Sequence, residues 1–459
     1  MMHKYCLHGF HIVVDPNSGS VHFVDKLVFD LLDYVKGPLS EELPKELFFC
    51  QDYGLKDIEE AYCEIYKLYK NKLLFSEPSK PNISYTIGHK IPIKAACLHI
   101  SHDCDLRCRY CFAGAGAFGG KRMNMSLDVG KKAIDFLLKR SLSRKNIEVD
   151  FFGGEPLLNF DVVQGVVSYA REQEKKTNKS FRFTLTTNGI GLDDEKVDYL
   201  NQEMSSVALS IDGRKATNDR MRVHTDGTGC YDEILPKFKD LVAKRGGKNY
   251  YVRGTFTRMN LDFTDDILHL VDEGFKEISL EPVVSDETSP YSITEKELPQ
   301  VLKEYERLAA VMIDKEKQKQ GFNFYHFSVI GKNSPCMSKR VKGCGAGAEY
   351  VAITPDADIY PCHQLVGMKE YIMGNVMEGI VDVGKQVQFA SININFKKKC
   401  ADCWAKLYCS GGCNANNVKF GHDFSKPHEI SCEIQKKRLE CTFVIEAARE
   451  MLGQNSPST

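Results

Sequence analysis

Three cysteines on one short stretch have the spacing of a metal-cluster site. Cys104, Cys108 and Cys111 lie in the segment CDLRCRYC. A cube of four irons and four sulfides needs four ligands, so three thiolates would leave one iron open to a small molecule with two donor atoms. The alternative is a three-ligand zinc site with water. It is disfavoured because the stretch follows a predicted barrel strand and has no nearby carboxylate–His arrangement for hydrolysis.

A second group of cysteines lies towards the end of the chain. The 17 cysteines in 459 residues are too few for a disulfide scaffold, so clustered thiols in a reducing compartment favour metal or redox chemistry. The run Cys400-x2-Cys403-x5-Cys409-x3-Cys413 is the most specific part, and taken alone it also fits a zinc ribbon. The remaining members of the group are Cys336, Cys344, Cys362, Cys432 and Cys441.

Two further motifs could bind a small charged ligand. In Gly153-Gly154-Glu155-Pro156 the glycines permit close approach of the backbone, and the carboxylate can hold an ammonium group. The alternative is a tight turn with a solvated glutamate. Arg222 can grip a carboxylate with two parallel hydrogen bonds, although a surface role is the commoner one and Arg220 competes with it.

The elements that must position these residues alternate strand and helix. Strand-like runs are followed by amphipathic helical stretches, which indicates βα units and a parallel sheet. The expected strands are 94–101, 146–152, 182–188, 207–212, 250–256 and 277–284. The fold class is α/β, with a partial barrel of six βα units. CDLRCRYC, GGEP, TTNG and SIDG each come at the end of a strand, where such barrels carry their chemistry.

Three other regions flank the barrel at 94–325. Residues 1–78 form a small unit with two strands (11–15 and 21–25), two helical segments (25–35 and 56–72) and a possible returning strand at 73–75. A polar linker is expected over 79–93. Residues 326–452 are Cys-rich and close with a helix over 430–452, and 453–459 are expected to be a disordered tail.

Composition excludes several classes of protein. The 61 basic and 62 acidic residues leave a net charge of −1, which gives no reason to expect nucleic-acid or membrane partners. No stretch is long and apolar enough to span a bilayer, and the first residues lack a secretory signal. A cytoplasmic location is therefore expected.

The first cysteine motif resembles the signature of the radical S-adenosylmethionine (SAM) superfamily, in which an aromatic residue precedes the last cysteine. Tyr110 holds that position. The resemblance implies that the three cysteines hold a SAM-binding cluster and that Gly154 and Glu155 bind the amino group of SAM. It also implies that Ser210 and Arg222 bind its ribose and carboxylate. Asn188 in TTNG is a weaker candidate, since a strand-ending turn explains it nearly as well.

The later cysteines resemble the SPASM extension, which carries two auxiliary iron–sulfur clusters. By that resemblance Cys400, Cys403, Cys409 and Cys432 hold the outer cluster, and Cys344, Cys362 and Cys413 hold the inner one. The inner cluster is expected to keep one open iron, with Cys336 as the competing ligand. The other cysteines are interpreted as packing residues: Cys6, Cys50, Cys63, Cys97, Cys230 and Cys441.

The whole chain resembles the maturases of small cysteine-rich peptides called SCIFF, through KYCLHGFHIVVDPNSG, DFFGGEP, LTTNG, SIDG and YPCHQ. This implies a winged-helix-like unit that grips the leader of a ribosomal precursor peptide, thioether formation between a cysteine sulfur and a carbon, and a low-potential electron donor of ferredoxin or flavodoxin type. One alternative is an anaerobic sulfatase-maturing enzyme, in which an aspartate follows the YPC cysteine; here His363 does. His363 itself is either a hydrogen-bond donor near a cluster or a surface residue. A zinc-binding scaffold is the alternative from another class.

Overall fold

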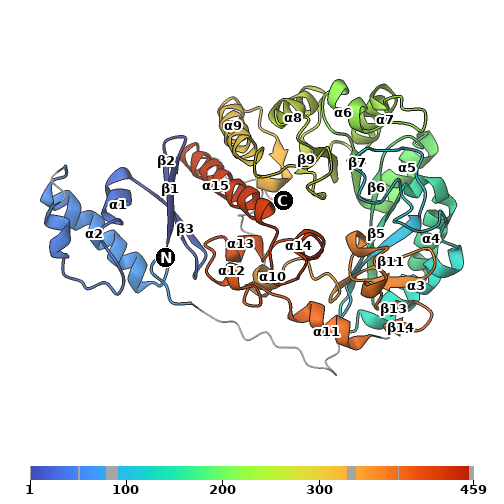
Figure 1. Cartoon of the computed structure of the whole chain (residues 1–459), viewed down its shortest axis with the longest axis horizontal. Helices are drawn as coiled ribbons and strands as arrows, with labels where there is room; N and C mark the ends of the chain where they lie inside the picture. The colour runs from blue at the N-terminus through green and yellow to red at the C-terminus, as the bar shows by residue number, and fades with distance from the viewer. Residues whose placement is uncertain (1, 50–51, 79–90, 328–336, 381, 454–459) are drawn as a thin grey trace.

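Six parallel strands form the centre of the molecule, at the positions that the sequence predicts (Figure 1). The computed structural model describes residues 2–49, 52–78, 91–327, 337–380 and 382–453. Each strand pairs in parallel with the next one along the chain. The strands are β4 (Ala95–Ser101), β5 (Asn146–Gly153), β6 (Ser180–Thr187), β7 (Met204–Ser210), β8 (Tyr250–Phe256) and β9 (Glu277–Pro282), and the short β10 (Asn323–Phe324) extends the β9 edge.

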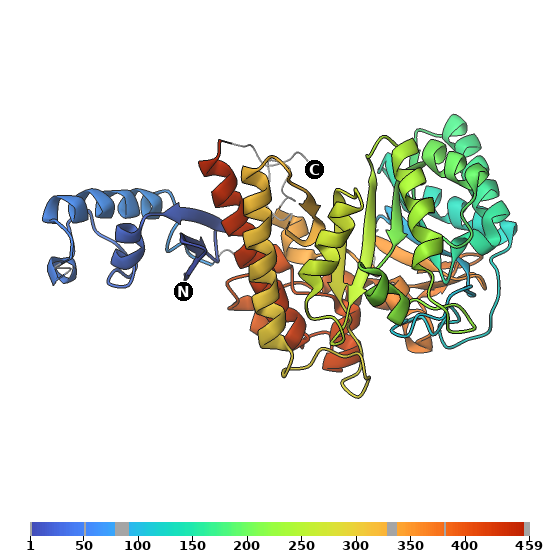
Figure 2. The ribbon, with the colours of Figure 1, turned by 90° about the horizontal axis from the view of Figure 1, so that it is seen from above.

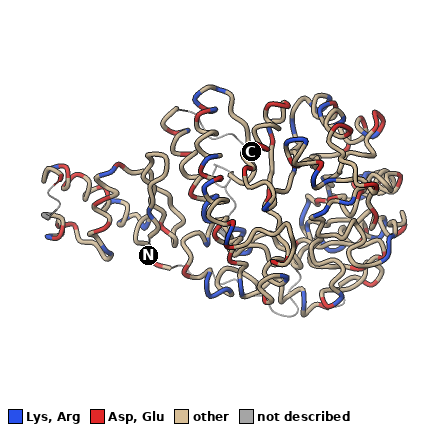
Figure 3. The backbone as a smooth tube through the Cα atoms, turned by 45° about the horizontal axis from the view of Figure 1, so that its top comes forward, with Lys and Arg blue, Asp and Glu red and all other residues tan. Residues whose placement is uncertain are grey.

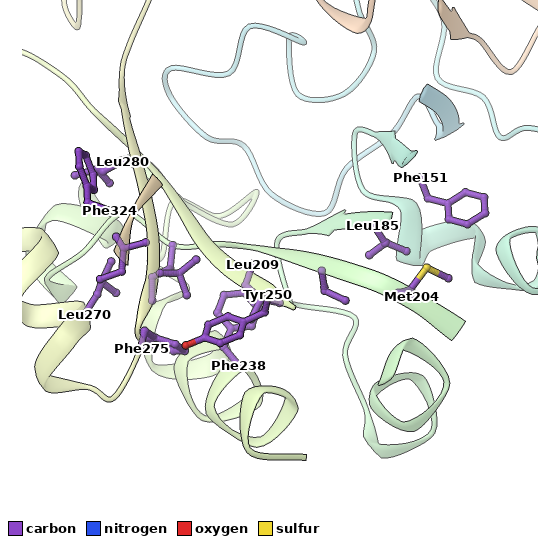
Figure 4. Packing of buried hydrophobic residues seen from close by; sticks show 14 of the residues in the cluster. Phe151, Leu185, Met204, Leu209, Phe238, Tyr250, Leu270, Phe275, Leu280 and Phe324 are labelled. Carbon is purple, nitrogen blue, oxygen red and sulfur yellow. The ribbon is translucent and has the colours of Figure 1, made fainter. Parts of the chain in front are cut away.

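Helices cover the outer face of these strands. They are α3 (Leu127–Arg140), α4 (Phe160–Lys176), α5 (Asp194–Glu203), α6 (Lys215–Met221), α7 (Tyr231–Lys244), α8 (Phe263–Asp272) and α9 (Leu298–Lys317), with a 3-10 turn at Pro156–Asn159. In β5 the buried Ile147, Val149 and Phe151 alternate with more exposed residues, so one face of the strand meets the helices and the other faces the barrel interior. Figure 4 shows Phe151, Leu185 and Leu209 in this packed core.

The Cys-rich region continues the same sheet instead of forming a separate body. Strand β11 (Tyr350–Ile353) pairs in parallel with β4, and β12 (Asp358–Tyr360), β13 (Gly374–Asn375) and β14 (Gly379–Ile380) follow antiparallel. Its helices are α10 (Met337–Lys342), α11 (Val383–Ser391), α12 (Lys398–Ala401), α13 (Lys406–Cys409), α14 (Asn414–Gly421) and α15 (Glu429–Met451), with 3-10 turns at Tyr325–Phe327, His363–Leu365 and Lys369–Tyr371. Helix α15 lies against α9, as Figure 2 shows, and Arg438 of α15 donates two hydrogen bonds to the buried Tyr305 hydroxyl.

The N-terminal unit projects from one side of the molecule (Figure 2). It contains the antiparallel sheet β1 (His3–Leu7), β2 (Phe10–Asp15) and β3 (Ser20–Val24), then α1 (Lys26–Leu31), a 3-10 turn at Lys45–Phe49 and α2 (Leu55–Lys70). Strand β1 is an addition to the prediction. The strand expected at 73–75 is wrong, because those residues form bends after α2. Ile91 and Ile93, placed in the linker by the sequence, are buried.

Charged residues of both signs are interspersed along the chain (Figure 3). No helix among the described residues combines the length and apolar character that crossing a bilayer requires.

Candidate functional site

One cavity of about 700 Å³ contains most of the predicted site residues. It opens at the carboxyl ends of the six central strands and extends to the Cys-rich region. From the first motif set its lining includes Cys104, Cys108, Tyr110, Cys111, Gly154, Glu155, Asn188, Ser210 and Arg222. From the second set it includes Cys344, Cys409, Cys413 and Cys432, whereas Cys362, Cys400 and Cys403 do not line it. The two motif groups therefore face a shared space.

The loop with the first three cysteines follows β4 and is held by backbone contacts. The amides of Arg107 and Arg109 donate to the carbonyls of Val223 and Met221 at 2.7 and 2.9 Å. Burial raises the pKa of Cys108 to about 12, and Arg222 offsets part of that rise. Burial also raises the pKa of Cys104, and the negative charge of Glu155 raises it further. Such thiols ionise when a metal replaces the proton.

The GGEP segment joins the end of β5 to the cysteine loop. A Cβ at Gly154 would lie 2.1 Å from the carbonyl oxygen of Asp103, so this glycine is required for close packing against the chain's own loop, in addition to lining the cavity. The Glu155 carboxylate is buried and accepts from the Leu157 amide, the Thr187 hydroxyl and the Asn188 amide at 3.0, 2.8 and 2.7 Å. Burial nevertheless raises the pKa of Glu155 to about 8.

Asn188 at the end of β6 holds the cysteine loop directly. Its Nδ2 donates to Asp105 Oδ1 at 2.6 Å and to Cys104 Sγ at 3.5 Å, while its Oδ1 accepts from the Ile190 amide at 3.0 Å. The side-chain amide is therefore engaged within the protein, which favours positioning of Cys104 over direct contact with a ligand.

Asp212 is a site residue that the sequence analysis did not single out. It follows β7 and is fully buried. Its carboxylate accepts from the Tyr110 hydroxyl at 2.9 and 2.7 Å and from Arg222 Nε at 3.0 Å. Burial raises the pKa of Asp212, and Arg222 opposes that rise. Its place in the SIDG motif, directly after a strand, was the available signal.

A charged pair on β8 and β9 forms another part of the cavity wall, and it was also missed. Arg253 Nη2 contacts Glu281 Oε2 at 2.8 Å. Burial opposes ionisation of Glu281, but Arg253 first and then His326 hold its pKa at about 2, so the pair is charged at neutral pH. Arg253 and Glu281 are isolated charged residues on two different strands, and no local sequence pattern indicates that their side chains would be in contact.

The four cysteines predicted for the outer cluster lie near one another. Burial raises the pKa of Cys400 and Cys409 to about 11 and of Cys432 to about 12. The charge of Cys403 raises the pKa of each of these three thiols further. Another member of the group also raises each pKa: Cys432 for Cys400, Cys400 for Cys409 and Cys409 for Cys432.

The three cysteines predicted for the inner cluster, Cys344, Cys362 and Cys413, also lie near one another. The pKa of Cys362 is raised to about 12, mainly by burial and further by the charges of Cys413 and Cys344. Cys336 lies outside the described residues. His363, next to Cys362, is near Tyr350, whose hydroxyl is 3.2 Å from its Nδ1. Among the non-cluster cysteines, Cys97, Cys230 and Cys441 are buried as predicted. Cys6 and Cys63 are exposed, so the packing interpretation was wrong for them, and Cys50 is not described.

Cysteine thiolates are the usual ligands of iron–sulfur clusters, and all three cysteine groups supply them. Within the described ranges, no three His, Cys, Asp or Glu side chains are arranged to hold one metal ion. Asn416 Oδ1 and Asn417 Nδ2 are buried without a hydrogen-bond partner among the described residues, and both asparagines line the cavity beside Cys413. Orphaned polar atoms next to grouped thiols are consistent with a group that occupies this end of the cavity.

The N-terminal sheet docks onto the segment that carries the outer cysteines. His3 stacks on Trp404, with ring centroids 4.0 Å apart, and its Nε2 is 3.0 Å from Glu440 Oε1. The Tyr408 hydroxyl donates to the carbonyl of Gly19 at 2.5 Å. Trp404 and Tyr408 are the neighbours of Cys403 and Cys409 in the sequence.

Comparisons with known proteins agree with this architecture. Residues 98–241 match the family model "Radical SAM superfamily", and 344–404 match the SPASM "Iron-sulfur cluster-binding domain". The "Radical SAM cyclopropyl synthase TigE" of Paramaledivibacter caminithermalis is 22% identical over 88% of this chain and 86% of its own length. The "Cysteine-type anaerobic sulfatase-maturating enzyme" of Clostridium novyi is 23% identical over 69% and 86%.

Solved structures share the fold at low identity. The structure of anSMEcpe with AdoMet (SAM) and the Kp18Cys peptide has a TM-score of 0.65 at 19% identity, over 78% of this chain and all of that chain. Streptococcus suis SuiB bound to the precursor peptide SuiA has a TM-score of 0.52 at 18% identity, over 91% and 95%. The fold is a radical SAM α/β core with a partial barrel and a C-terminal SPASM domain.

Proposed function

We propose that this protein is a peptide maturase. Its radical SAM core and SPASM domain imply that it uses SAM, a SAM-binding 4Fe–4S cluster and auxiliary clusters. It joins cysteine sulfurs to carbons of acceptor residues in a ribosomally made, cysteine-rich peptide of the SCIFF type. The observation that carries this proposal is the shared cavity, in which Cys104, Cys108 and Cys111 face the same space as Cys344 and Cys413.

We assign the SAM end of the cavity to the first motif set. Cys104, Cys108 and Cys111 hold the cluster, and Asn188 fixes Cys104 through its Nδ2 donation. When bound, the cluster and SAM supply a carbon radical that removes hydrogen from a substrate carbon. Glu155 and Gly154 receive the amino group, Ser210 the ribose and Arg222 the carboxylate. Among the described residues the Arg222 guanidinium bonds to Asp212 through Nε and lies over the Tyr110 ring, with 5.7 Å between Cζ and the ring centroid, and no hydrogen bond engages its Nη atoms, which are left for a carboxylate.

We assign the auxiliary clusters to the two cysteine groups described above. Cys400, Cys403, Cys409 and Cys432 hold the outer one. Cys344, Cys362 and Cys413 hold the inner one, whose fourth ligand is Cys336 or a thiolate of the substrate. None of the 15 described cysteines forms a disulfide, so all of the assigned ligands among them are available to clusters.

The protein groups between the two ends of the cavity position the peptide. Arg253 and Glu281 present a donor fork and an acceptor on the cavity wall, which suits the amide groups of an extended backbone. The N-terminal unit holds the leader and increases the local concentration of the core peptide. A ferredoxin- or flavodoxin-type donor supplies electrons.

Formylglycine formation is the second candidate, because the Clostridium novyi relative is named as a sulfatase-maturating enzyme. His363 stands where an aspartate is expected for that activity. Mass spectrometry of products separates the two. A thioether loses two hydrogens and keeps the cysteine sulfur, whereas formylglycine formation removes the sulfur. Reduced holoenzyme should modify a SCIFF-type precursor in the first way; modification only of a sulfatase-derived peptide, with loss of sulfur, would replace our proposal by the second candidate.

A further inference from the structure

Lys397 is a lysine buried between the two auxiliary cysteine groups. Its exposed fraction is 1%, and it is one of the largest fully buried side chains. Its Nζ donates to the Gly411 carbonyl at 2.6 Å and to Asn414 Oδ1 at 2.9 Å. Both acceptors are neutral, and no carboxylate in the described part of the chain forms an ion pair with it.

A buried ammonium without a counter-ion is costly, so its charge needs an explanation. Burial lowers the pKa of Lys397, and the charges of nearby cysteine thiolates offset only part of that decrease. These thiolates come from both groups: Cys400, Cys409 and Cys432 from the outer one and Cys413 from the inner one. The ammonium thus lies within electrostatic reach of both predicted clusters.

The same side chain fixes the turn that joins the two groups. Gly411 lies between Cys409 and Cys413, with φ +85°, and a Cβ there would be 3.4 Å from Lys397 Nζ. A purely structural role would be served by any donor to the Gly411 carbonyl. The placement among thiolates adds a role that depends on charge.

We propose that Lys397 is a positioning residue whose buried ammonium is the counter-ion of the auxiliary clusters and raises their reduction potential. A cube with thiolate ligands is anionic, and reduction adds one more negative charge. A nearby fixed cation therefore favours the reduced form, since cluster potentials respond to local charge and hydrogen bonding. This inference rests on the proposed cysteine assignment.

The test is a redox titration of anaerobically purified holoenzyme, followed by electron paramagnetic resonance. Lys397→Gln keeps a donor for Gly411 and removes the charge, Lys397→Met removes both, and Lys397→Arg keeps the charge. At the wild-type midpoint, both neutral variants should lower the ratio of reduced to oxidised auxiliary cluster about tenfold, or ~59 mV for one electron. Lys397→Arg should stay close to wild type. Lys398→Met, at an exposed neighbour, is the matched control and should change nothing.

Each outcome has a meaning. Wild-type potentials in an iron-replete Lys397→Gln variant would overturn the proposal. Loss of auxiliary iron from the neutral variants but not from Lys397→Arg would support a requirement for charge, whereas loss from all three would show a structural role and overturn it. If wild-type protein with full SAM-cluster iron has no auxiliary cluster signals, the cysteine assignment itself fails. The redox titration does not depend on thioether formation. The role of Lys397 would therefore hold even if the enzyme proved not to form thioethers.

Discussion

The hydroxyl of Tyr110 donates to both carboxylate oxygens of Asp212, at 2.7 and 2.9 Å, and so ties the cysteine loop to the end of β7. Arg222 Nε donates to Oδ1 of the same carboxylate at 3.0 Å. The aromatic residue of the signature is thereby locked in place, and the arginine proposed for the SAM carboxylate shares its anchor. The buried Asp212 therefore positions both the cysteine loop, through Tyr110, and the side chain of Arg222.

Removing the Tyr110 hydroxyl should destabilise this anchor. Tyr110→Phe leaves the buried Asp212 with fewer donors, and we expect a loss of about 1–3 kcal/mol in the free energy of unfolding. Denaturant unfolding measures it. Tyr169→Phe is the matched control, since the Tyr169 hydroxyl bonds to Asp135 at 2.8 Å on the outer helices. An equal loss in both variants would contradict the special role of the buried pair.

SAM binding should strengthen as pH rises towards 8. Burial raises the pKa of Glu155 from its ordinary 4.5 to about 8, so below pH 8 the free carboxyl is largely protonated and binding an ammonium group requires loss of that proton. By linkage, the same shift makes the fold less stable as pH rises from 4.5 to 8, because the folded state holds the proton more tightly there.

Calorimetric titration of cluster-loaded enzyme with SAM between pH 6 and pH 9 measures this effect. Glu155→Gln should flatten the pH profile and weaken binding roughly ten- to hundredfold, the usual value of a charged hydrogen bond. A Glu155→Gln variant that keeps the wild-type slope would show that another group carries the proton.

Loss of the first cysteine set should remove one cluster only. The triple change of Cys104, Cys108 and Cys111 to Ala should lower iron content by about a third, because it removes one of three cubes, and should leave the auxiliary spectra intact. Iron analysis and electron paramagnetic resonance measure this. Cys230→Ala, at a buried thiol close to Cys108, is the control and should keep full iron. Collapse of all cluster signals in the triple variant would indicate that the groups are not independent.

Leader binding should occur on the N-terminal unit. A precursor without its leader should bind at least tenfold more weakly, and the leader alone should slow hydrogen exchange in residues 2–24. The tryptophan fluorescence of Trp404, which stacks on His3, gives a second signal because the chain contains one tryptophan. Equal affinity with and without the leader, or protection confined to the barrel, would refute this recognition role.

The sequence predicted the βα core well because apolar strand-like runs alternate with amphipathic helical stretches, and four of the six strands end in a motif. The outer and inner cysteine groups follow from the resemblance to the SPASM extension rather than from spacing, and their roles as ligands stay a prediction. Strand β1 was missed because HKYCL is short and mixes polar with apolar residues. Contacts such as Arg253 with Glu281 and His3 with Trp404 depend on the tertiary fold, which no local pattern encodes.

The most direct measurement of the central claim is the fate of SAM on reduced, iron-replete enzyme. The account predicts methionine and 5′-deoxyadenosine from the wild type, and neither from the variant that lacks Cys104, Cys108 and Cys111. Wild-type enzyme that never releases deoxyadenosine, or a triple variant that still does, would contradict it.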